Sequence, residues 1–342
     1  LHSGPVKGQD PNFSQFYYNL LYYNPSYAGL QSGLNVRMNY RKAWPRLGDG
    51  FNSFNVSMES EEATLFGGIG LLAFSGNEGG STLNHSGFNF SYAYRLILIP
   101  RQFVIQMGMS AGMMQKKIDW NDFTFSDQLD PVFGDIYPTS FSYPEGDKVM
   151  YPDFSTGFVG RFNLGKSYRN TPMFTGTVGM AFHHITQPEE SFLGFKSKLP
   201  LKYVFHADAV IPLNKRGKND IMIAPAVIYE HQHQFQTFTA GFNALKSPIY
   251  AGLWWRNQSF QLNQGHMESL IVMFGVNTEL PNNMGLKIGY SYDMTLSDLR
   301  SATSGSHEVS LCFEFDGVKL FNPRQRSMRQ SARTNNQCFT HF

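Results

Sequence analysis

A serine is the first residue of this chain whose type and spacing could support catalysis. Gly108-Met109-Ser110-Ala111-Gly112 matches the G-x-S-x-G spacing of a nucleophile elbow. An elbow needs a sharp turn between a strand and a helix, which exposes the serine hydroxyl. Here small residues recur at every second position, and this pattern is typical of a strand that packs closely. An outer-membrane hydrolase that uses Ser110 is the alternative that the motif leaves open.

Histidines and aspartates could hold a metal ion, but their spacing does not specify one. His183 and His184 are adjacent, so on a strand they would face opposite ways. His231 and His233 share a face if extended, yet no third zinc ligand lies near them. Aspartates gather in one stretch without the spacing of an EF-hand: Asp119, Asp122, Asp127, Asp130 and Asp135. Since no phosphate loop or dinucleotide fingerprint is present either, we expect no catalytic residue, no cofactor and no metal site.

The composition limits the elements that could position these side chains. The chain has 342 residues, of which 15% are aromatic and 16% charged, and its net charge is +2. This charge is too small to predict a nucleic-acid partner. Two cysteines, Cys312 and Cys338, are too few for a disulfide framework. No apolar run approaches the roughly 18 residues of a membrane helix, which leaves a soluble all-β protein or a membrane β-barrel.

Segments of about ten residues alternate large apolar side chains with small or polar ones. From Phe88 to Leu96, every second residue is apolar, and Asn89 and Ser91 lie on the opposite face. Charges of both signs follow the polar faces: Arg37, Arg41, Glu59, Arg95, Asp208, Lys287, Asp293, Glu308 and Glu314. A basic side chain on the lipid face costs roughly 2–4 kcal/mol at the membrane midplane. We therefore expect these charges to point inward and to crosslink the lumen; the alternative is that they only hydrate a water-filled interior.

About 14 such segments lie between residues 34 and 315, and they predict a transmembrane antiparallel β-barrel of about 14 strands. The connections alternate between short ones, such as 246–248, and long ones, such as 118–150 and 186–200. Membrane barrels have this asymmetry, with short periplasmic turns and long outer loops.

An even number of strands places both ends of the barrel sequence on the periplasmic side. We therefore expect residues 1–33 to form a periplasmic N-terminal segment that packs into or across the mouth of the barrel. Residues 316–342 are then expected to form a periplasmic tail, which carries several arginines.

Short sequence motifs spread over residues 9–315 resemble the PorP/SprF family of the type IX secretion system. Gln9-Asp10-Pro11-Asn12-Phe13-Ser14-Gln15-Phe16 and Asn24-Pro25-Ser26-Tyr27-Ala28-Gly29 are similar to the opening of that family. Tyr40-Arg41-Lys42-Ala43-Trp44-Pro45 also resembles the opening of that family. Tyr290-Ser291-Tyr292-Asp293 and Gly305-Ser306-His307-Glu308-Val309-Ser310-Leu311 resemble its closing hairpin.

The resemblance implies a non-catalytic component of the type IX secretion and gliding machinery in the outer membrane of a Gram-negative bacterium. Its partners would be other periplasmic and outer-membrane components and a cognate secreted adhesin, which it would help to export or anchor at the surface. We expect the outer loops to contact the secreted partner, with Phe192 and Leu193 as exposed apolar candidates. The basic tail, with Arg324 and Arg326, is expected to contact the machinery. The alternative function is a channel for small solutes or hydrophobic compounds, which needs an open or ligand-filled lumen.

Overall fold

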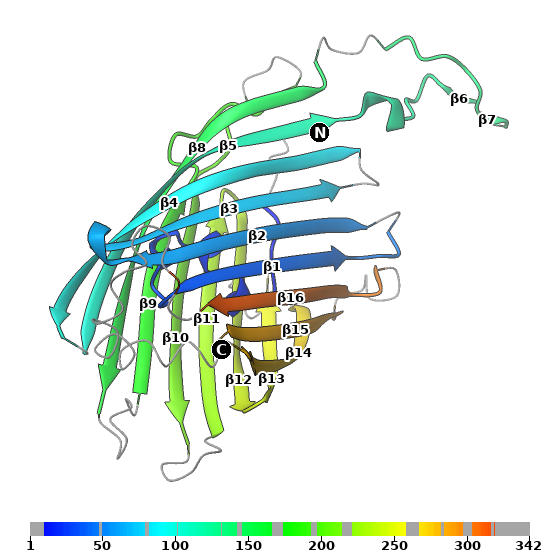
Figure 1. Ribbon diagram of the computed structural model, residues 1–342. Coiled ribbons are helices and arrows are strands. Elements are labelled where there is room, and N and C mark those ends of the chain that lie inside the picture. The colour runs from blue at the N-terminus through cyan, green and yellow to red at the C-terminus, as the bar shows by residue number, and fades with distance from the viewer. Residues whose placement is uncertain are drawn as a thin grey trace.

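The chain folds into a closed antiparallel barrel of 14 strands (Figure 1). The computed structural model describes residues 10–47, 50–78, 82–100, 102–130, 132–141, 146–165, 174–192, 197–213, 221–257, 267–281, 284–296, 303–315 and 318. The barrel strands are β1 (Leu34–Ala43), β2 (Phe51–Glu62), β3 (Gly67–Glu78), β4 (Leu83–Ile99), β5 (Phe103–Ile118), β8 (Lys148–Leu164), β9 (Phe174–His183), β10 (Lys202–Pro212), β11 (Ile221–Gln232), β12 (Phe235–Lys246), β13 (Ile249–Asn257), β14 (Met267–Leu280), β15 (Met284–Thr295) and β16 (Ser306–Phe315).

Each barrel strand pairs with its neighbour along the chain, and β1 pairs with β16 to close the ring. The closing register runs without interruption from the pair Leu34 and Phe315 to the pair Ala43 and Ser306. These pairings confirm the predicted fold class. A barrel has no free sheet edge along the closed part of its wall, so its backbone groups are satisfied within the sheet.

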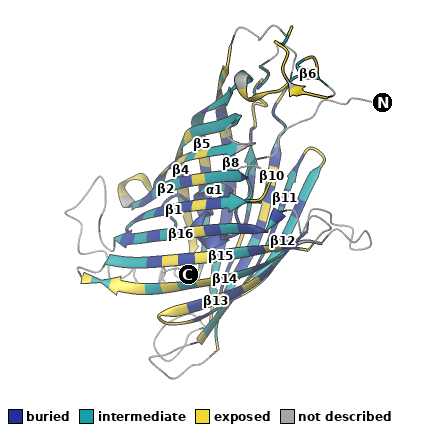
Figure 2. Ribbon diagram, turned by 90° about the vertical axis from the view of Figure 1, so that its right-hand side faces the viewer, coloured by how far each residue is buried: buried dark blue, intermediate teal, exposed yellow. Residues whose placement is uncertain are grey.

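Burial alternates along the strands because one face meets the lumen and the other faces outward (Figure 2). In β4, Phe88 and Phe90 are exposed, whereas Ser91 and Ala93 are buried. The same alternation buries the charges that were expected to point inward, with Arg95 half-buried. In the described part of the chain, no helix is long and apolar enough to cross a membrane.

Two strands show where sequence patterns were incomplete. The alternating pattern runs from Phe88 to Leu96, but β4 runs from Leu83 to Ile99 and ends in a segment that is apolar on both faces. Pro225 lies in β11, which is an interior strand, although proline is usually confined to edge strands and bulges. Its ladder with β10 skips from the pair Asp208 and Ala226 to the pair Ile211 and Ile223, because proline has no N–H to donate.

The barrel has two distinct ends. At the base end, β1 begins and β16 ends. At the arm end, residues 119–147 join β5 to β8, and the described part of this connection extends away from the barrel (Figure 1). This connection, hereafter the arm, contains η4 (Trp120–Asp122) and a small sheet of β6 (Leu129–Asp130) and β7 (Gly134–Asp135). A further short turn, η3 (Ala63–Leu65), joins β2 to β3 at the base end.

Residues 10–33 lie inside the barrel and fill its lumen. They form three short turns, η1 (Phe16–Tyr18), α1 (Leu20–Tyr23) and η2 (Pro25–Tyr27). Figure 2 shows α1 enclosed by the strands, in the colour of buried residues. The Asn24 side chain accepts a hydrogen bond from the Ser26 N–H at 2.9 Å, and Pro25 supplies the fixed φ angle that suits the first position of the last turn.

Candidate functional site

The lumen is filled by aromatic side chains of the N-terminal segment. Phe16 and Tyr27 are almost completely buried, and their ring centroids lie 5.6 Å and 5.2 Å from that of His206 in β10. Asn24 and Tyr27 contact the two ring nitrogens of His206 at 3.2 Å and 3.3 Å. Close packing of large rings around a buried histidine leaves the centre of the lumen occupied by protein.

A cluster of opposite charges fixes Ser14 near the arm end. Arg41 contacts Asp293 at 2.7 Å and Glu308 at 3.2 Å, and Arg256 contacts Asp293 at 3.1 Å. The Ser14 hydroxyl donates to Asp293 and its backbone N–H donates to Glu308, each at 2.6 Å. The segment inside the lumen is therefore bonded to β1, β13, β15 and β16 through buried, mutually neutralising groups.

The base end of the lumen is closed by a second set of contacts. Gln106 donates to the carbonyl oxygen of Ala28 at 2.7 Å, and Arg95 donates to that of Gly29. Gly29 has a φ of +64°, and a Cβ there would lie 2.5 Å from the Ser60 carbonyl oxygen and 2.7 Å from the Gly68 Cα. Only glycine allows the segment to lie this close to the wall.

Opposite charges also line the base end. Arg37 pairs with Glu59 at 2.5 Å, and Lys287 pairs with Glu314 at 2.6 Å. Together with the cluster around Arg41, these pairs confirm the prediction of a crosslinked lumen.

A third group of contacts holds Asp10 at the arm end. His184 lies between two carboxylates, with its ring nitrogens 2.9 Å from an oxygen of Asp10 and 2.9 Å from an oxygen of Asp153. Burial opposes the protonation of His184, but these carboxylates outweigh it and raise the pKa of His184 to about 10. Although burial alone would raise the pKa of Asp10, His184 and Lys202 hold it well below its usual value. Asp10 and His184 therefore form an ion pair at neutral pH.

A cavity of about 600 Å³, part of which is continuous with solvent, lies beside this ion pair. Its polar lining includes His85, Asn89, Ser110 and His183, and its apolar lining includes Phe74. Buried polar atoms of His85 and Asn89 have no hydrogen-bond partner in the structure. Polar groups without protein partners favour bound water, so the cavity beside the lumen segment is suited to hold water.

Ser110 lies within β5, as the alternating pattern predicted, and its side chain is buried on the lumen face. No sharp strand-to-helix turn is present there, and Ser110 makes no hydrogen bond to a histidine of the described residues. His183 instead contacts the Ser155 hydroxyl and the Tyr23 carbonyl oxygen, each at 3.1 Å. The geometry lacks the nucleophile–base contact that serine catalysis requires.

His183 and His184 do not face opposite ways, although their adjacency on a strand predicted that they would. His183 and His184 both line the cavity, because β9 ends at His183 and His184 turns back with a φ of +58°. Across the described ranges, no group of three or more His, Cys, Asp or Glu side chains is arranged to hold a metal ion.

The arm carries apolar side chains that project into solvent. Val132 is 80% exposed and Phe133 is 76% exposed, and Ile136 and Tyr137 are about half exposed. A carboxylate of the arm stabilises the turn that carries these side chains. Asp130 accepts hydrogen bonds from the N–H groups of Val132 and Phe133 at 2.8 Å and 3.0 Å, and from the Tyr137 hydroxyl at 3.1 Å. These bonds to neighbouring groups also lower the pKa of Asp130.

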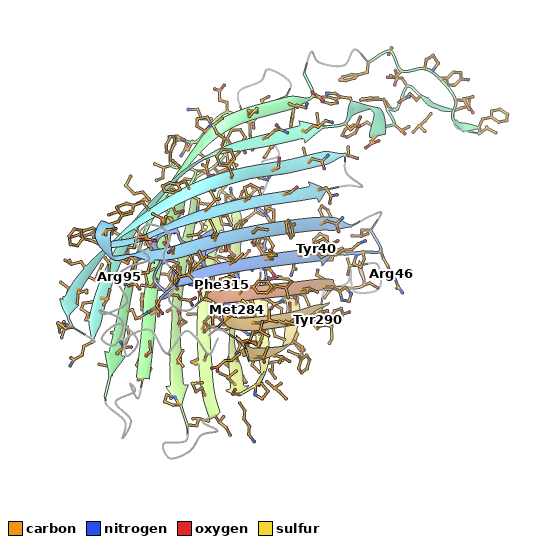
Figure 3. All side chains as sticks on the ribbon, viewed as in Figure 1. Tyr40, Arg46, Arg95, Met284, Tyr290 and Phe315 are labelled. Carbon is orange, nitrogen blue, oxygen red and sulfur yellow. The ribbon has the colours of Figure 1, made fainter. Side chains whose placement is uncertain are left out.

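The inner part of the arm is ordered by stacked rings and a second aspartate. The rings of Phe125 and Phe141 stack with centroids 4.5 Å apart. Asp127 accepts hydrogen bonds from the Ser140 N–H at 2.6 Å and from its hydroxyl at 2.8 Å. The side chains of the arm are drawn as sticks at the upper right of Figure 3.

The structure describes one of the four residues proposed for partner contact. Phe192 is half-buried in the connection between β9 and β10. Leu193, Arg324 and Arg326 lie outside the described residues. The outer loop at 118–150 was among those expected to contact the partner, but its exposed residues were not singled out, although the pairs Val132-Phe133 and Ile136-Tyr137 were a signal that could have found them.

Comparison with known structures finds other barrels at very low sequence identity. The NanC porin is 10% identical, covers 83% of this chain and 99% of its own, and has a TM-score of 0.39. CdiB from Acinetobacter baumannii is 7% identical and has a TM-score of 0.44; the match covers 82% of this chain and 60% of CdiB. The CymD monoaromatic hydrocarbon channel is 10% identical and has a TM-score of 0.40; the match covers 87% of this chain and 93% of CymD.

Comparison with curated proteins finds no match. The family model described as "Type IX secretion system membrane protein PorP/SprF" matches residues 6–313, which is nearly the whole chain. The chain therefore belongs to the PorP/SprF family of type IX secretion system membrane proteins, and it is an outer-membrane β-barrel of a Gram-negative bacterium.

Proposed function

We propose that this outer-membrane component holds a secreted, adhesin-like protein at the cell surface through its arm and has no catalytic activity. The observation that carries the proposal is the set of exposed apolar side chains on the arm, Val132, Phe133, Ile136 and Tyr137. Exposed apolar groups of this kind are typical of protein-binding surfaces. Aromatic residues among them are the usual anchors of such contacts.

The arm is well suited to binding because its turns are ordered before a partner arrives. Asp127 and Asp130 accept hydrogen bonds from the backbone N–H groups that shape these turns. A preordered surface loses less conformational entropy on association. The apolar anchors are therefore presented in a defined arrangement, which supports selective recognition.

The charge of the arm points to the kind of partner. Residues 119–147 contain seven carboxylates and no lysine or arginine: Asp119, Asp122, Asp127, Asp130, Asp135, Glu145 and Asp147. The whole chain has a net charge of +2, so this acidity is local. We infer that the partner surface is an apolar groove with basic residues around it. Such complementarity speeds encounter and weakens as salt screens it.

The filled lumen supports this function over a solute channel. The described residues 10–33 occupy the interior, and buried hydrogen bonds from Ser14 to Asp293 and Glu308 connect them to the wall. Among the described residues, the cavity beside His184 favours a channel, but it lies beside the lumen segment, which occupies the centre of the barrel. The barrel is better suited to act as a rigid support for the arm.

Surface retention of type IX cargo in living cells tests the proposal. The variant Phe133→Asp/Ile136→Asp keeps the barrel but removes two apolar anchors, and Leu47→Asp is the matched control in an exposed outer turn. We expect the double variant to reach the membrane at the normal level and to release several-fold more secreted partner into the medium. The Leu47→Asp control should retain the secreted partner at the cell surface. Equal retention by both variants would contradict the proposal.

A further inference from the structure

The hairpin of β4 and β5 at the base end carries apolar residues on both faces. Leu96, Ile97, Leu98 and Ile99 are 45%, 56%, 48% and 49% exposed. Leu96 and Ile97 are consecutive residues before the register shift between Ile97 and Ile99, so they point to opposite faces, and no single covering layer explains both. In Figure 1, the ends of β4 and β5 extend past the turn at η3.

One backbone edge of this hairpin is unpaired. The ladder between β3 and β4 ends at the pair Gly67 and Tyr94, and the Arg95 N–H donates to the Phe66 carbonyl oxygen at 2.7 Å. Beyond Arg95, which Figure 3 labels, β4 pairs only with β5 among the described residues. Backbone groups in a strand alternate between its two edges, so those of Ile97 point to the same open edge as those of Arg95.

Lipid is a poor occupant of this edge. Hydrocarbon satisfies the outward-facing side chain of Leu96 but leaves unpaired N–H and C=O groups without partners, at a cost of several kcal/mol each. Water satisfies the backbone but leaves four large apolar side chains exposed. No charged residue lies between Leu96 and Pro100 to block pairing with another strand, although edge strands usually carry such a residue.

We infer that the β4 edge at Leu96–Ile99 receives an extended segment of a partner protein, which adds to the barrel wall as a short β-strand. Main-chain hydrogen bonds to Ile97 supply the attachment, as in other cases of strand addition. Because both faces of the hairpin are apolar, the added segment is a continuous apolar run of four or five residues and not an alternating one. Leu65 and Phe66, which are exposed next to this edge, widen the apolar surface that it covers.

This surface lies at the opposite end of the barrel from the arm. A protein bound here would therefore not compete with one bound at Val132 and Phe133. Failure of one contact leaves the other intact, so the two proposals can be tested separately.

Hydrogen–deuterium exchange tests the inference. The exchange of residues 96–100 is compared between the chain isolated in nanodiscs and the assembly purified from native membranes in mild detergent. We expect fast exchange at Ile97 in the isolated chain and exchange slowed by about tenfold or more in the assembly. Equal exchange in both samples would overturn the inference. Slow exchange in the isolated monomer would also overturn it, since lipid or the chain itself would then cover the edge.

Two variants connect the exposed edge to assembly. Ile97→Lys places a charge at the edge, and Ile97→Val preserves both the apolar surface and the backbone N–H. We expect Ile97→Lys to reduce the recovered assembly several-fold while the barrel still shows the heat-dependent gel shift of a folded membrane protein, and Ile97→Val to behave as the wild type. Retention of the assembly by Ile97→Lys would contradict strand addition. A doubled mass of the isolated chain with a protected edge would show self-pairing and would replace the partner by a second copy.

Discussion

At the residue scale, the lumen is built from charges that neutralise each other around a short segment of chain. Asp293 forms ion pairs with Arg41 and Arg256 and accepts a hydrogen bond from the Ser14 hydroxyl. Glu308 forms an ion pair with Arg41 and accepts a hydrogen bond from the Ser14 N–H. Removing one partner from such a set leaves a buried charge uncompensated, which is far more costly than losing an exposed ion pair.

The Arg41→Met variant tests this cost. We expect it to lower the free energy of unfolding by about 3–5 kcal/mol, because Asp293 and Glu308 lose their shared cation in a buried site. Arg46→Met is the matched control, since Arg46 is exposed in the turn after β1 and is labelled in Figure 3. Denaturant unfolding of both variants in detergent micelles measures the difference. Equal midpoints would show that the cluster does not stabilise the fold.

The ion pair between His184 and Asp10 predicts a dependence of stability on pH. The pKa of His184 is raised to about 10, above its usual value of 6.5. Its contribution is therefore complete below pH 6.5 and is lost as the pH rises towards 10. The lowered pKa of Asp10 acts in the opposite direction, so its contribution is present above pH 3.8 and is lost as the pH falls further.

We expect the unfolding temperature of the wild type to fall between pH 7 and pH 10, and His184→Gln to remove most of that decline. His233→Gln, in an exposed turn, is the control and should follow the wild type. Gel-shift melting curves at pH 6, 8 and 10 measure the effect. A wild-type curve that is flat across this range would contradict the ion pair.

At the scale of the elements, strands were predictable because their environment is periodic. Phe88 and Phe90 must face outward and Ser91 inward, and a two-residue period records this requirement directly in the sequence. The 14 segments expected between residues 34 and 315 correspond to the 14 barrel strands, of which β1 begins at Leu34 and β16 ends at Phe315. The alternation in β4 stops at Leu96, although the strand continues to Ile99.

The contents of the lumen were not predictable to the same degree. Ser14 meets Glu308 across 294 positions, and no local period records a contact of that kind. Composition and alternation showed only that charges of both signs face inward. The positions of Asp10 and His184, and of the exposed side chains on the arm, depend on tertiary packing.

The outward face of β4 and the exposed arm should differ in how they tolerate an added charge. Phe90→Arg places a cation on the outward face of β4, where it should cost roughly 2–4 kcal/mol at the membrane midplane and reduce insertion. Phe133→Arg, the same change on the exposed arm, should leave insertion unchanged. The fraction of heat-modifiable barrel in outer-membrane preparations compares them. Normal insertion of Phe90→Arg would contradict the lipid-facing assignment of that face.

The order of the arm depends on its aspartates. Asp130→Ala removes the acceptor for the N–H groups of Val132 and Phe133, so we expect protease cleavage within residues 119–147 to become several-fold faster. Asp122→Ala, at an exposed position of the same loop, is the control. Limited proteolysis followed by mass spectrometry measures the rates. Identical rates in the two variants would mean that these hydrogen bonds do not order the arm.

At the scale of the whole molecule, the barrel separates two tasks. Its wall and the segment at residues 10–33 form one packed body, while the arm at one end and the β4–β5 hairpin at the other carry exposed apolar groups. A support with contact surfaces at both ends suits a component of a secretion machine. A conducting pore would instead require a continuous aqueous path.

Single-channel recording in planar bilayers tests the central claim that the lumen is closed by the chain's own N-terminal segment. A variant that lacks residues 1–30, and whose gel shift shows a folded barrel, serves as the positive control. We predict that the full-length protein gives no stepwise ionic current and that the shortened barrel conducts. Stable conductance from the full-length protein, equal to that of the shortened one, would contradict this account.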